Sequence, residues 1–143
     1  MQLTRHTDFA LRLLIHVAAR PDERVQIADV ASAHAISRTH LMKVANRLAH
    51  LGFIETARGR GGGIRLARAA EDINLAEVVC ATEPGTALVQ CGGCGLLAGG
   101  CRLPSIFGEA FAAFRDHLAK YSLADLMRQD RQSAFAVPEA TGG

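Results

Sequence analysis

The feature that most constrains the fold is a glycine-rich segment that separates two short strand-like runs directly after an amphipathic helix. Residues 37–50 repeat apolar side chains at helical spacing, whereas residues 53–58 and 64–67 have the composition of short strands. Four of the five residues from 59 to 63 are glycine, which favours a tight turn between the two strands. The sequence therefore predicts a β-hairpin that immediately follows a helix.

Two more helices are expected before this hairpin. A helical pattern begins at Thr7 and is ended by Pro21. A short second helix over residues 27–34 is followed by a tight turn at residues 35–36, and Ser37 is placed to cap the next helix. Two short helices joined by a tight turn indicate a helix-turn-helix, and the hairpin after them is its wing. We therefore predict a mainly α fold with a small β-hairpin, built on a winged helix-turn-helix domain.

The helix over residues 37–50 exposes hydroxyl, amide and cationic side chains opposite its apolar stripe. Lys and Arg neutralise phosphates, whereas Asn, Thr and Arg pair with base edges in the major groove. An ordinary solvated helix face would explain these residues equally well, but the basic glycine-rich hairpin beside them favours DNA binding. A nucleotide-binding loop is excluded because no Gly-Lys-Ser or Gly-Lys-Thr follows the glycines. The predicted DNA-contacting residues are Ser37, Arg38, Thr39, His40, Lys43, Asn46 and Arg47 on the helix, with Arg58, Arg60, Gly61 and Arg65 on the hairpin.

The distribution of charge points to the same partner. The formal net charge of the whole chain is only +2. Residues 1–68 hold 11 basic and 5 acidic side chains, whereas residues 69–143 hold 5 basic and 9 acidic ones. This contrast between a basic front half and an acidic back half indicates a polyanion as the partner of the front half, and we expect double-stranded DNA.

Three of the four cysteines lie close together in the pattern C-x2-C-x6-C, as Cys91, Cys94 and Cys101. Five glycines in the same stretch make regular structure costly, so packing alone is not expected to hold this loop. Three close thiolates suit a soft metal, either zinc or an iron–sulfur cluster, with a fourth ligand from elsewhere. A redox-active pair of Cys91 and Cys94, or unligated cysteines, are the alternatives. Cys80, in a helix that Asn74 is placed to cap, is expected to be a small buried core residue.

A long helix is predicted from Pro104 to about Tyr121. Its larger apolar residues recur at spacings of 4, 3, 4 and 3, which is the pattern of a coiled-coil seam and favours a homodimer. Ser122 and Asp125 have the spacing of a capping box for a last short helix over residues 123–129. The seam residues are Phe107, Phe111, Phe114, Leu118 and Tyr121.

The expected organisation has four parts: a winged helix-turn-helix domain over residues 1–84, a cysteine-rich cluster-binding loop over 85–103, a dimerisation helix with a short capping helix over 104–129, and a disordered tail over 130–143. No apolar run is long enough to span a bilayer, and no export signal opens the chain, so we expect a cytoplasmic protein with reduced thiols. A thiol–disulfide enzyme is the remote alternative, but the chain lacks the expected βαβ context. We therefore expect a protein that is not an enzyme.

Particular segments carry a resemblance to a known family, namely Met1–Thr4, Thr7–Asp8, Ala10–Arg12, Ser37–Lys43, Arg58–Leu66 and Leu123–Leu126. Together they resemble the small winged-helix iron–sulfur regulators, a family that includes IscR-type and NsrR-type proteins. The resemblance runs over nearly the whole chain up to about Leu126. It implies a cytoplasmic, homodimeric bacterial repressor that holds an iron–sulfur cluster and binds a palindromic operator.

Within that family, the chain is most similar to the NsrR type at Glu83–Pro84, Cys91 and Cys101–Leu103. This similarity implies that nitric oxide modifies the cluster and releases the DNA. It also implies that Asp8 of the partner subunit joins the three cysteines as a ligand of a [4Fe-4S] cluster, with [2Fe-2S] as the alternative. An acidic residue in the first turn of a helix, favourable to the helix dipole, is the other interpretation of Asp8. The spacing between Cys91 and Cys94 is shorter than is usual in that type. An IscR-type regulator of cluster or redox status, or a zinc-stabilised repressor, therefore remains the second interpretation.

Overall fold

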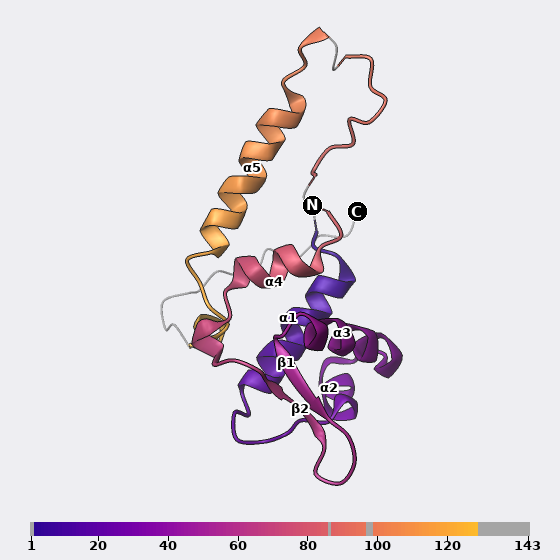
Figure 1. Ribbon diagram of the computed structural model, residues 1–143, viewed down its shortest axis with the longest axis vertical. Helices are drawn as coiled ribbons and strands as arrows, with labels where there is room; N and C mark the ends of the chain where they lie inside the picture. The colour runs from indigo at the N-terminus through magenta and orange to yellow at the C-terminus, as the bar shows by residue number, and fades with distance from the viewer. Residues whose placement is uncertain (1, 86, 97–98, 129–143) are drawn as a thin grey trace, which may run out of the picture.

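The structure, a computed structural model, describes residues 2–85, 87–96 and 99–128 (Figure 1). It confirms a mainly helical fold with one antiparallel hairpin. The predicted tail over residues 130–143 lies outside the described residues. In chain order the elements are α1 (Arg5–Ala18), α2 (Ile27–His34), α3 (Arg38–His50), β1 (Ile54–Ala57), β2 (Gly63–Leu66), η1 (Ala70–Asp72), α4 (Leu75–Thr82), α5 (Leu103–Leu118) and η3 (Ala124–Met127).

Helix α1 is the centre of the core. Its residues Leu13 and Leu14 are fully buried, and the core they share also receives side chains from α2, α3 and both strands. The helix begins before the expected Thr7, because the Thr4 hydroxyl oxygen accepts a hydrogen bond from the Thr7 N–H at 3.3 Å and so caps the first turn. This packing places α3 against α1 with one face turned outward.

The helix-turn-helix forms as predicted. Ala35 has a φ of +52°, which turns the chain sharply after α2, and Ile36 is buried at the turn. Helix α3 buries the four residues of the expected stripe, Leu41, Val44, Ala45 and Leu48. Ser37 occupies the N-cap position of α3, but its side chain makes no capping hydrogen bond, so this part of the prediction is wrong.

The wing is held at its base by a third segment of chain. β1 pairs with β2 in a register that places Glu55 opposite Arg65 and Ala57 opposite Gly63. On the other side of β2, the N–H groups of Val25 and Ile64 each donate to the other residue's carbonyl oxygen at 2.8 Å. The hairpin is therefore anchored to the segment that precedes α2.

Helix α4 is capped as expected, because the Asn74 side-chain oxygen accepts from the Ala76 N–H at 3.0 Å. The prediction that Cys80 lies in the core is wrong: the residue is only half-buried. The buried residues Leu75, Val78, Val79 and Thr82 form an i, i+3, i+4, i+7 stripe, and Cys80 flanks it.

Helix α5 projects from the body of the molecule, with the cysteine loop at its far end (Figure 1). It ends at Leu118, earlier than predicted, because the Tyr121 carbonyl oxygen accepts from the Leu75 N–H at 3.0 Å and turns the chain back toward α4. Tyr121 therefore lies beyond the helical seam. No helix in the described part of the chain combines the length and hydropathy that a bilayer crossing requires.

The short helix after α5 differs from the prediction in type. Residues 124–127 form a 3-10 helix, with the N–H of Asp125 donating to the Ser122 carbonyl at 3.1 Å. The Asp125 carboxylate accepts from the Ser122 N–H at 2.8 Å, which is one half of the predicted capping box. The Ser122 hydroxyl lies 3.1 Å from the same carboxylate instead of capping a backbone N–H. The last predicted residue of this helix, Gln129, lies outside the described residues.

Candidate DNA-binding surface and cysteine loop

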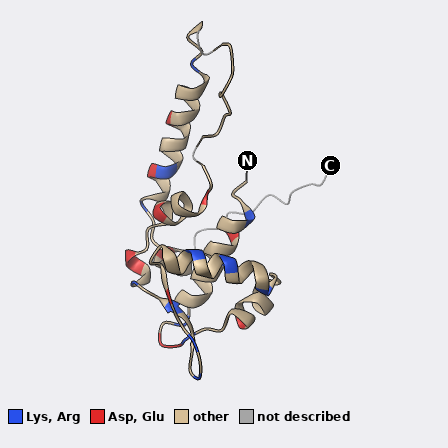
Figure 2. Ribbon diagram, turned by 45° about the vertical axis from the view of Figure 1, so that its right-hand side comes forward, with Lys and Arg blue, Asp and Glu red and all other residues tan. Residues whose placement is uncertain are grey.

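Helix α3 presents the predicted polar residues on its free face. Every one of Ser37, Arg38, Thr39, His40, Lys43, Asn46 and Arg47 is exposed. Basic positions gather along α3 and at the tip of the hairpin (Figure 2). A helix with exposed cationic, hydroxyl and amide groups beside a basic hairpin has the chemistry needed to contact both phosphates and base edges.

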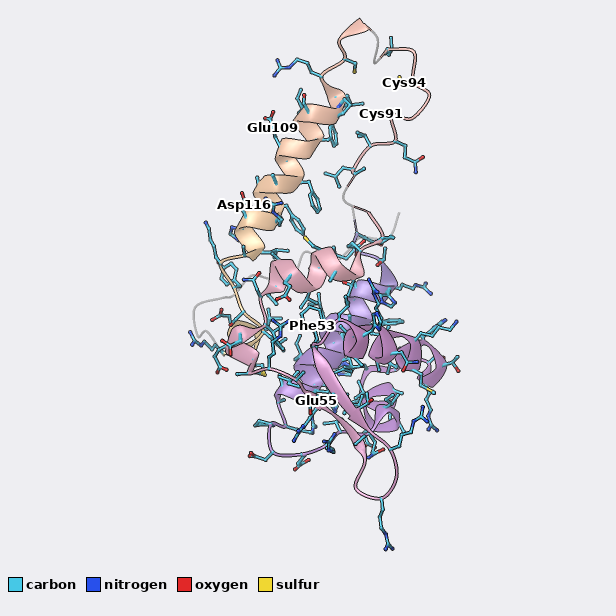
Figure 3. The ribbon with its side chains drawn as sticks, viewed as in Figure 1. Phe53, Glu55, Cys91, Cys94, Glu109 and Asp116 are labelled. Carbon is cyan, nitrogen blue, oxygen red and sulfur yellow. The ribbon has the colours of Figure 1, made fainter. Side chains whose placement is uncertain are left out.

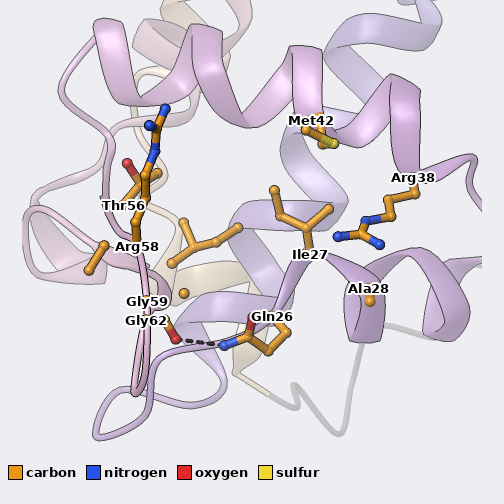
Figure 4. Close-up of a pocket in the computed structure, with 12 residues that line it drawn as sticks. Gln26, Ile27, Ala28, Arg38, Met42, Thr56, Arg58, Gly59 and Gly62 are labelled. Atoms are coloured by element: carbon orange, nitrogen blue, oxygen red, sulfur yellow. Dashed lines mark hydrogen bonds between the residues drawn. The ribbon is translucent and has the colours of Figure 1, made fainter.

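A cavity of about 310 Å³ separates the wing from the start of α3 (Figure 4). Arg38 lines it from α3 and Arg58 lines it from the hairpin. The wing is fixed across this cavity, because the Gln26 side-chain amide donates to the Gly62 carbonyl at 2.6 Å. The two arginines therefore face a common hollow from a rigidly placed helix and hairpin.

Two of the glycines of the wing, Gly62 and Gly63, have a steric cause. A side chain at Gly62 would collide with the carbonyl oxygen of Ala57, and one at Gly63 would lie 2.8 Å from the carbonyl oxygen of Val25. Gly63 also has a φ of +134°, which side chains disfavour. The close turn brings Arg60 and Gly61 to the outermost, exposed part of the hairpin.

The three arginines of the wing are not equivalent. Arg65 is paired with Glu55 on the neighbouring strand, with its Nε 2.9 Å and its Nη2 2.8 Å from the carboxylate. Within the described part of the chain, Arg58 and Arg60 form no salt bridge. Arg58 and Arg60 are therefore better placed to meet a phosphate than Arg65, whose charge is already partly compensated.

The cysteine loop leaves the body beyond α4, and Cys91 and Cys94 lie at its outer part (Figure 3). The Cys94 N–H donates to the Cys91 carbonyl at 3.1 Å, which makes a turn between the two thiols. Gly93 and Gly100, each directly before a cysteine, have φ values of +78° and +82°. All the cysteines are free thiols. The loop therefore offers three unpaired soft ligands on a backbone whose conformation at these points favours glycine.

The single chain does not bring the predicted ligands together. In the described ranges, no group of three or more His, Cys, Asp or Glu side chains is arranged to hold a metal ion. Asp8 is instead paired with Arg12 one turn later on α1, at 2.9 Å. Both Asp8 and Arg12 remain substantially exposed, with 46% and 49% of their side-chain surface accessible.

One residue at the start of the loop has a structural role that sequence reasoning missed. The Glu83 Oε1 atom accepts from the Thr4 N–H at 2.8 Å and from the Thr4 hydroxyl at 3.1 Å. Burial alone would raise the pKa of Glu83, but hydrogen bonds from Thr7 and Thr4, together with the charge of His6, outweigh it and lower the pKa. The carboxylate therefore ties the first turn of α1 to the point where the cysteine loop begins.

Comparison with known proteins identifies the family. The model of the Rrf2 family, described as an iron-dependent transcriptional regulator, matches residues 3–129. The chain belongs to the Rrf2 family. It is 45% identical over 133 residues to the HTH-type transcriptional regulator NsrR of Bacillus subtilis, and the match covers 90% of this chain and 91% of that protein. It is 44% identical over 138 residues to the NsrR of Geobacillus kaustophilus, with 93% of each chain covered.

Solved structures share the fold of this Rrf2-family chain. CymR of B. subtilis superposes with a TM-score of 0.72 at 18% identity, covering 88% of this chain and 95% of that one. IscR of T. potens superposes with a TM-score of 0.70 at 18% identity, covering 89% and 86%. These likenesses confirm the winged-helix architecture. The family and the NsrR relatives make the chain a DNA-binding transcriptional regulator, in agreement with the expectation that it is not an enzyme.

Proposed function

We propose that the chain is a homodimeric repressor that binds a palindromic operator and releases it when nitric oxide reacts with an iron–sulfur cluster. The observation that carries the proposal is the cysteine loop: three free thiols within a short glycine-rich segment of a chain 45% identical to a protein named NsrR. Neither an ordinary surface loop nor a DNA-reading element needs this combination of thiols and glycines.

The donor set fits an iron–sulfur cluster. Cys91, Cys94 and Cys101 would hold it as thiolates, and Asp8 of the partner subunit would supply the fourth ligand of a [4Fe-4S] form. The glycines before two of the cysteines have positive φ values, which allow the backbone to wrap closely around such a group. When bound, the cluster supplies iron that reacts with nitric oxide. The Arg12 Nε atom lies 2.9 Å from the Asp8 carboxylate, so Arg12 orients this carboxylate and balances its charge.

The contact between Glu83 and Thr4 provides a route from the loop to the DNA-binding surface. Glu83 lies two residues before the loop, and Thr4 caps the helix that packs against α3. A change in the position of residues 85–103 therefore reaches the first turn of α1 through this carboxylate. The resulting change in DNA affinity is limited by the difference between the contacts that the loop makes in its two positions.

Helix α5 supports the homodimer. None of its residues is buried within the chain. Phe107, Phe111 and Phe114 line an apolar groove of about 430 Å³ together with Leu3 and Leu88. An amphipathic helix left uncovered in this way is stabilised by burying its apolar side against a second copy. Two-fold symmetry would then present two α3 helices to the two half-sites of a palindrome.

The dimer is tested by sedimentation of two variants of α5. Phe107→Glu places a charge in the apolar groove and should give monomers, because burying an unpaired carboxylate opposes association. Glu109→Gln lies on the other side of the same helix and should leave the dimer intact. A Phe107→Glu protein that sediments as the wild type does would remove α5 from the interface.

The cluster is tested by anaerobic purification, iron and sulfide quantification, and absorption spectroscopy before and after nitric oxide. We expect a brown protein that contains iron and sulfide, with bands that nitric oxide changes, and operator binding that nitric oxide abolishes. A colourless protein with stoichiometric zinc would favour a zinc-stabilised repressor instead. DNA binding that follows cluster occupancy but ignores nitric oxide would favour an IscR-type regulator.

The docking of α3 and the wing is tested with Lys43→Ala and Arg60→Ala. If each residue contacts a phosphate, each variant should bind all duplexes more weakly and show a flatter dependence of affinity on salt. Arg115→Ala, on α5 and paired with Asp116, serves as the charge-matched control. An unchanged salt dependence in both variants would contradict this mode of docking.

A further inference from the structure

A pit of about 310 Å³ lies between the first turns of α1 and the middle of α3. It is lined by side chains of both helices and lies next to the predicted DNA-reading face. The lining residues are Arg5, His6, Phe9, His40, Lys43 and Val44.

The pit has an apolar floor and a cationic rim. Val44 is buried and Phe9 is half-buried, and the Phe9 ring lies 6.4 Å from the His40 ring between their centroids. Arg5 and Lys43 are exposed at the rim, and no acidic side chain of the described residues lines the pit. An apolar surface beside two cations matches a deoxyribose and its phosphate, since the sugar packs on carbon atoms and the phosphate is neutralised by lysine or arginine.

The position of the pit on α3 decides what it would meet. At about 100° per residue, Arg38 and Met42, which line the wing-side cavity, lie within roughly 40° of each other. His40 and Val44, which line the pit, lie roughly 200° and 240° round the helix axis from Arg38. The exposed residue Thr39 lies between the two sets, at roughly 100° from Arg38. The DNA-reading face of α3 is therefore flanked by the wing on one side and by the pit on the other.

From this geometry we infer that the pit is a second docking site for the DNA backbone, formed by α1 and α3 together. A helix inserted in the major groove has a phosphate strand on each side. The wing meets one of these strands, and the pit meets the other, with Arg5 and Lys43 on a phosphate and Phe9 beneath the sugar. This inference rests on the proposed docking of α3 and adds α1 to the DNA interface.

The test compares Arg5→Ala with Arg20→Ala in the full-length, anaerobically purified protein. Arg20 is an exposed arginine just beyond the other end of α1 and does not line the pit. The probe is a duplex selected by the wild-type protein from a random-sequence pool. We expect Arg5→Ala to weaken binding roughly threefold to tenfold and to lower the slope of log affinity against log salt by about 0.9 for each phosphate that is no longer neutralised. Arg5→Lys should restore the slope, and Arg20→Ala should leave it unchanged.

A second measurement locates the docking position on the DNA. Single neutral methylphosphonate substitutions are placed along each strand of the selected duplex. We expect one position per half-site at which the substitution weakens the wild type but not Arg5→Ala, on the strand opposite the one sensitive to Arg60→Ala. Because Arg5 is exposed, Arg5→Ala should unfold at the same denaturant midpoint as the wild type. A lower midpoint would show that the variant is destabilised.

The outcomes separate this inference from the proposed function. If Arg5→Ala binds with the same slope as Arg20→Ala while Lys43→Ala and Arg60→Ala are impaired, α1 lies outside the interface and the inference is wrong. If Arg5→Ala changes the sedimentation of the protein and not the slope, the pit is an interface between subunits and the inference is wrong. If the wild type binds no duplex, the proposed function itself fails.

Discussion

The chain has two glycine-rich segments, and they differ in how closely the rest of the chain packs on their glycines. In the wing, a side chain at Gly62 or Gly63 would strike backbone atoms of neighbouring segments. In the cysteine loop, a side chain at Gly92, Gly93 or Gly100 would meet nothing within 4 Å. Gly62 and Gly63 are thus required by packing within the chain, whereas the loop glycines, like Gly59 and Gly61 at the tip of the wing, have open space beside them.

This difference separates a part of the molecule that is held by its own packing from a part that the single chain leaves uncovered. The wing is fixed by the core, by Val25 and by the Gln26 amide, so its position is a property of the single chain. The loop has free thiols, and the helix that follows it buries none of its residues. The N-terminal domain therefore acts as a rigid reader, and residues 85–121 are completed by a cofactor and a second subunit under the proposed function.

The largest expected effect comes from removing a thiol of the loop. Cys101→Ser should reduce the iron content of anaerobically purified protein to near zero and abolish the response of DNA binding to nitric oxide, because serine is a poor ligand for iron in a cluster. Iron and sulfide quantification checks this. Cys80→Ser, on α4, is the matched control and should retain the cluster. Loss of iron in Cys80→Ser as well would make Cys80 a ligand and remove the need for Asp8.

The second effect concerns the packed glycines of the wing. Gly62→Ala should lower the free energy of unfolding by about 1–3 kcal/mol, because the new methyl group meets the Ala57 carbonyl and the turn must shift. The shift also breaks the hydrogen bond from Gln26, so affinity for DNA should fall as well. Urea unfolding and DNA titration measure the two changes. Unchanged stability would mean that the wing turn relaxes freely and is not fixed by packing.

A third effect lies at the boundary between the two parts. Glu83→Gln should destabilise the protein by about 1 kcal/mol at neutral pH, because hydrogen bonds from Thr4 to a carboxylate are replaced by weaker ones to an amide. The folded-state pKa of Glu83 is lowered, so its stabilisation is present above the ordinary value of 4.5 and is lost as the pH falls through the folded-state pKa. Urea unfolding of both proteins should therefore converge at acidic pH. A constant difference at all pH values would assign the effect to packing.

The winged-helix half was predictable in detail because its local preferences agree with its tertiary packing. The helical period of α3 predicted its buried stripe, and the glycines between two strands predicted the wing. The predictions that were wrong are local. Ser37 occupies the N-cap position but makes no capping hydrogen bond, and Cys80 lies beside the buried stripe of α4. Both depend on side-chain directions that a periodic pattern leaves open.

The sequence could not reveal interactions that join distant segments. Glu83 and Thr4 are 79 residues apart, and only the packing of α4 on α1 brings them together. The pairing of Arg65 with Glu55 depends on the register of the hairpin, so the pattern alone could not separate Arg65 from Arg58 and Arg60. The ligand set of the loop stays a prediction for the same reason, since its fourth member is assigned to another subunit.

The smallest expected effect concerns a glycine of the cysteine loop, which has open space beside it. Gly92→Ala should change the free energy of unfolding of the cofactor-free protein by no more than about 0.5 kcal/mol, because the new methyl group meets no atom within 4 Å. Urea unfolding under chelating, reducing conditions measures this. A destabilisation similar to that of Gly62→Ala would show that the loop is packed. If Gly92→Ala instead lowers only the iron content, the space around this glycine is used by the cofactor, whereas the space around Gly62 is used by the chain itself.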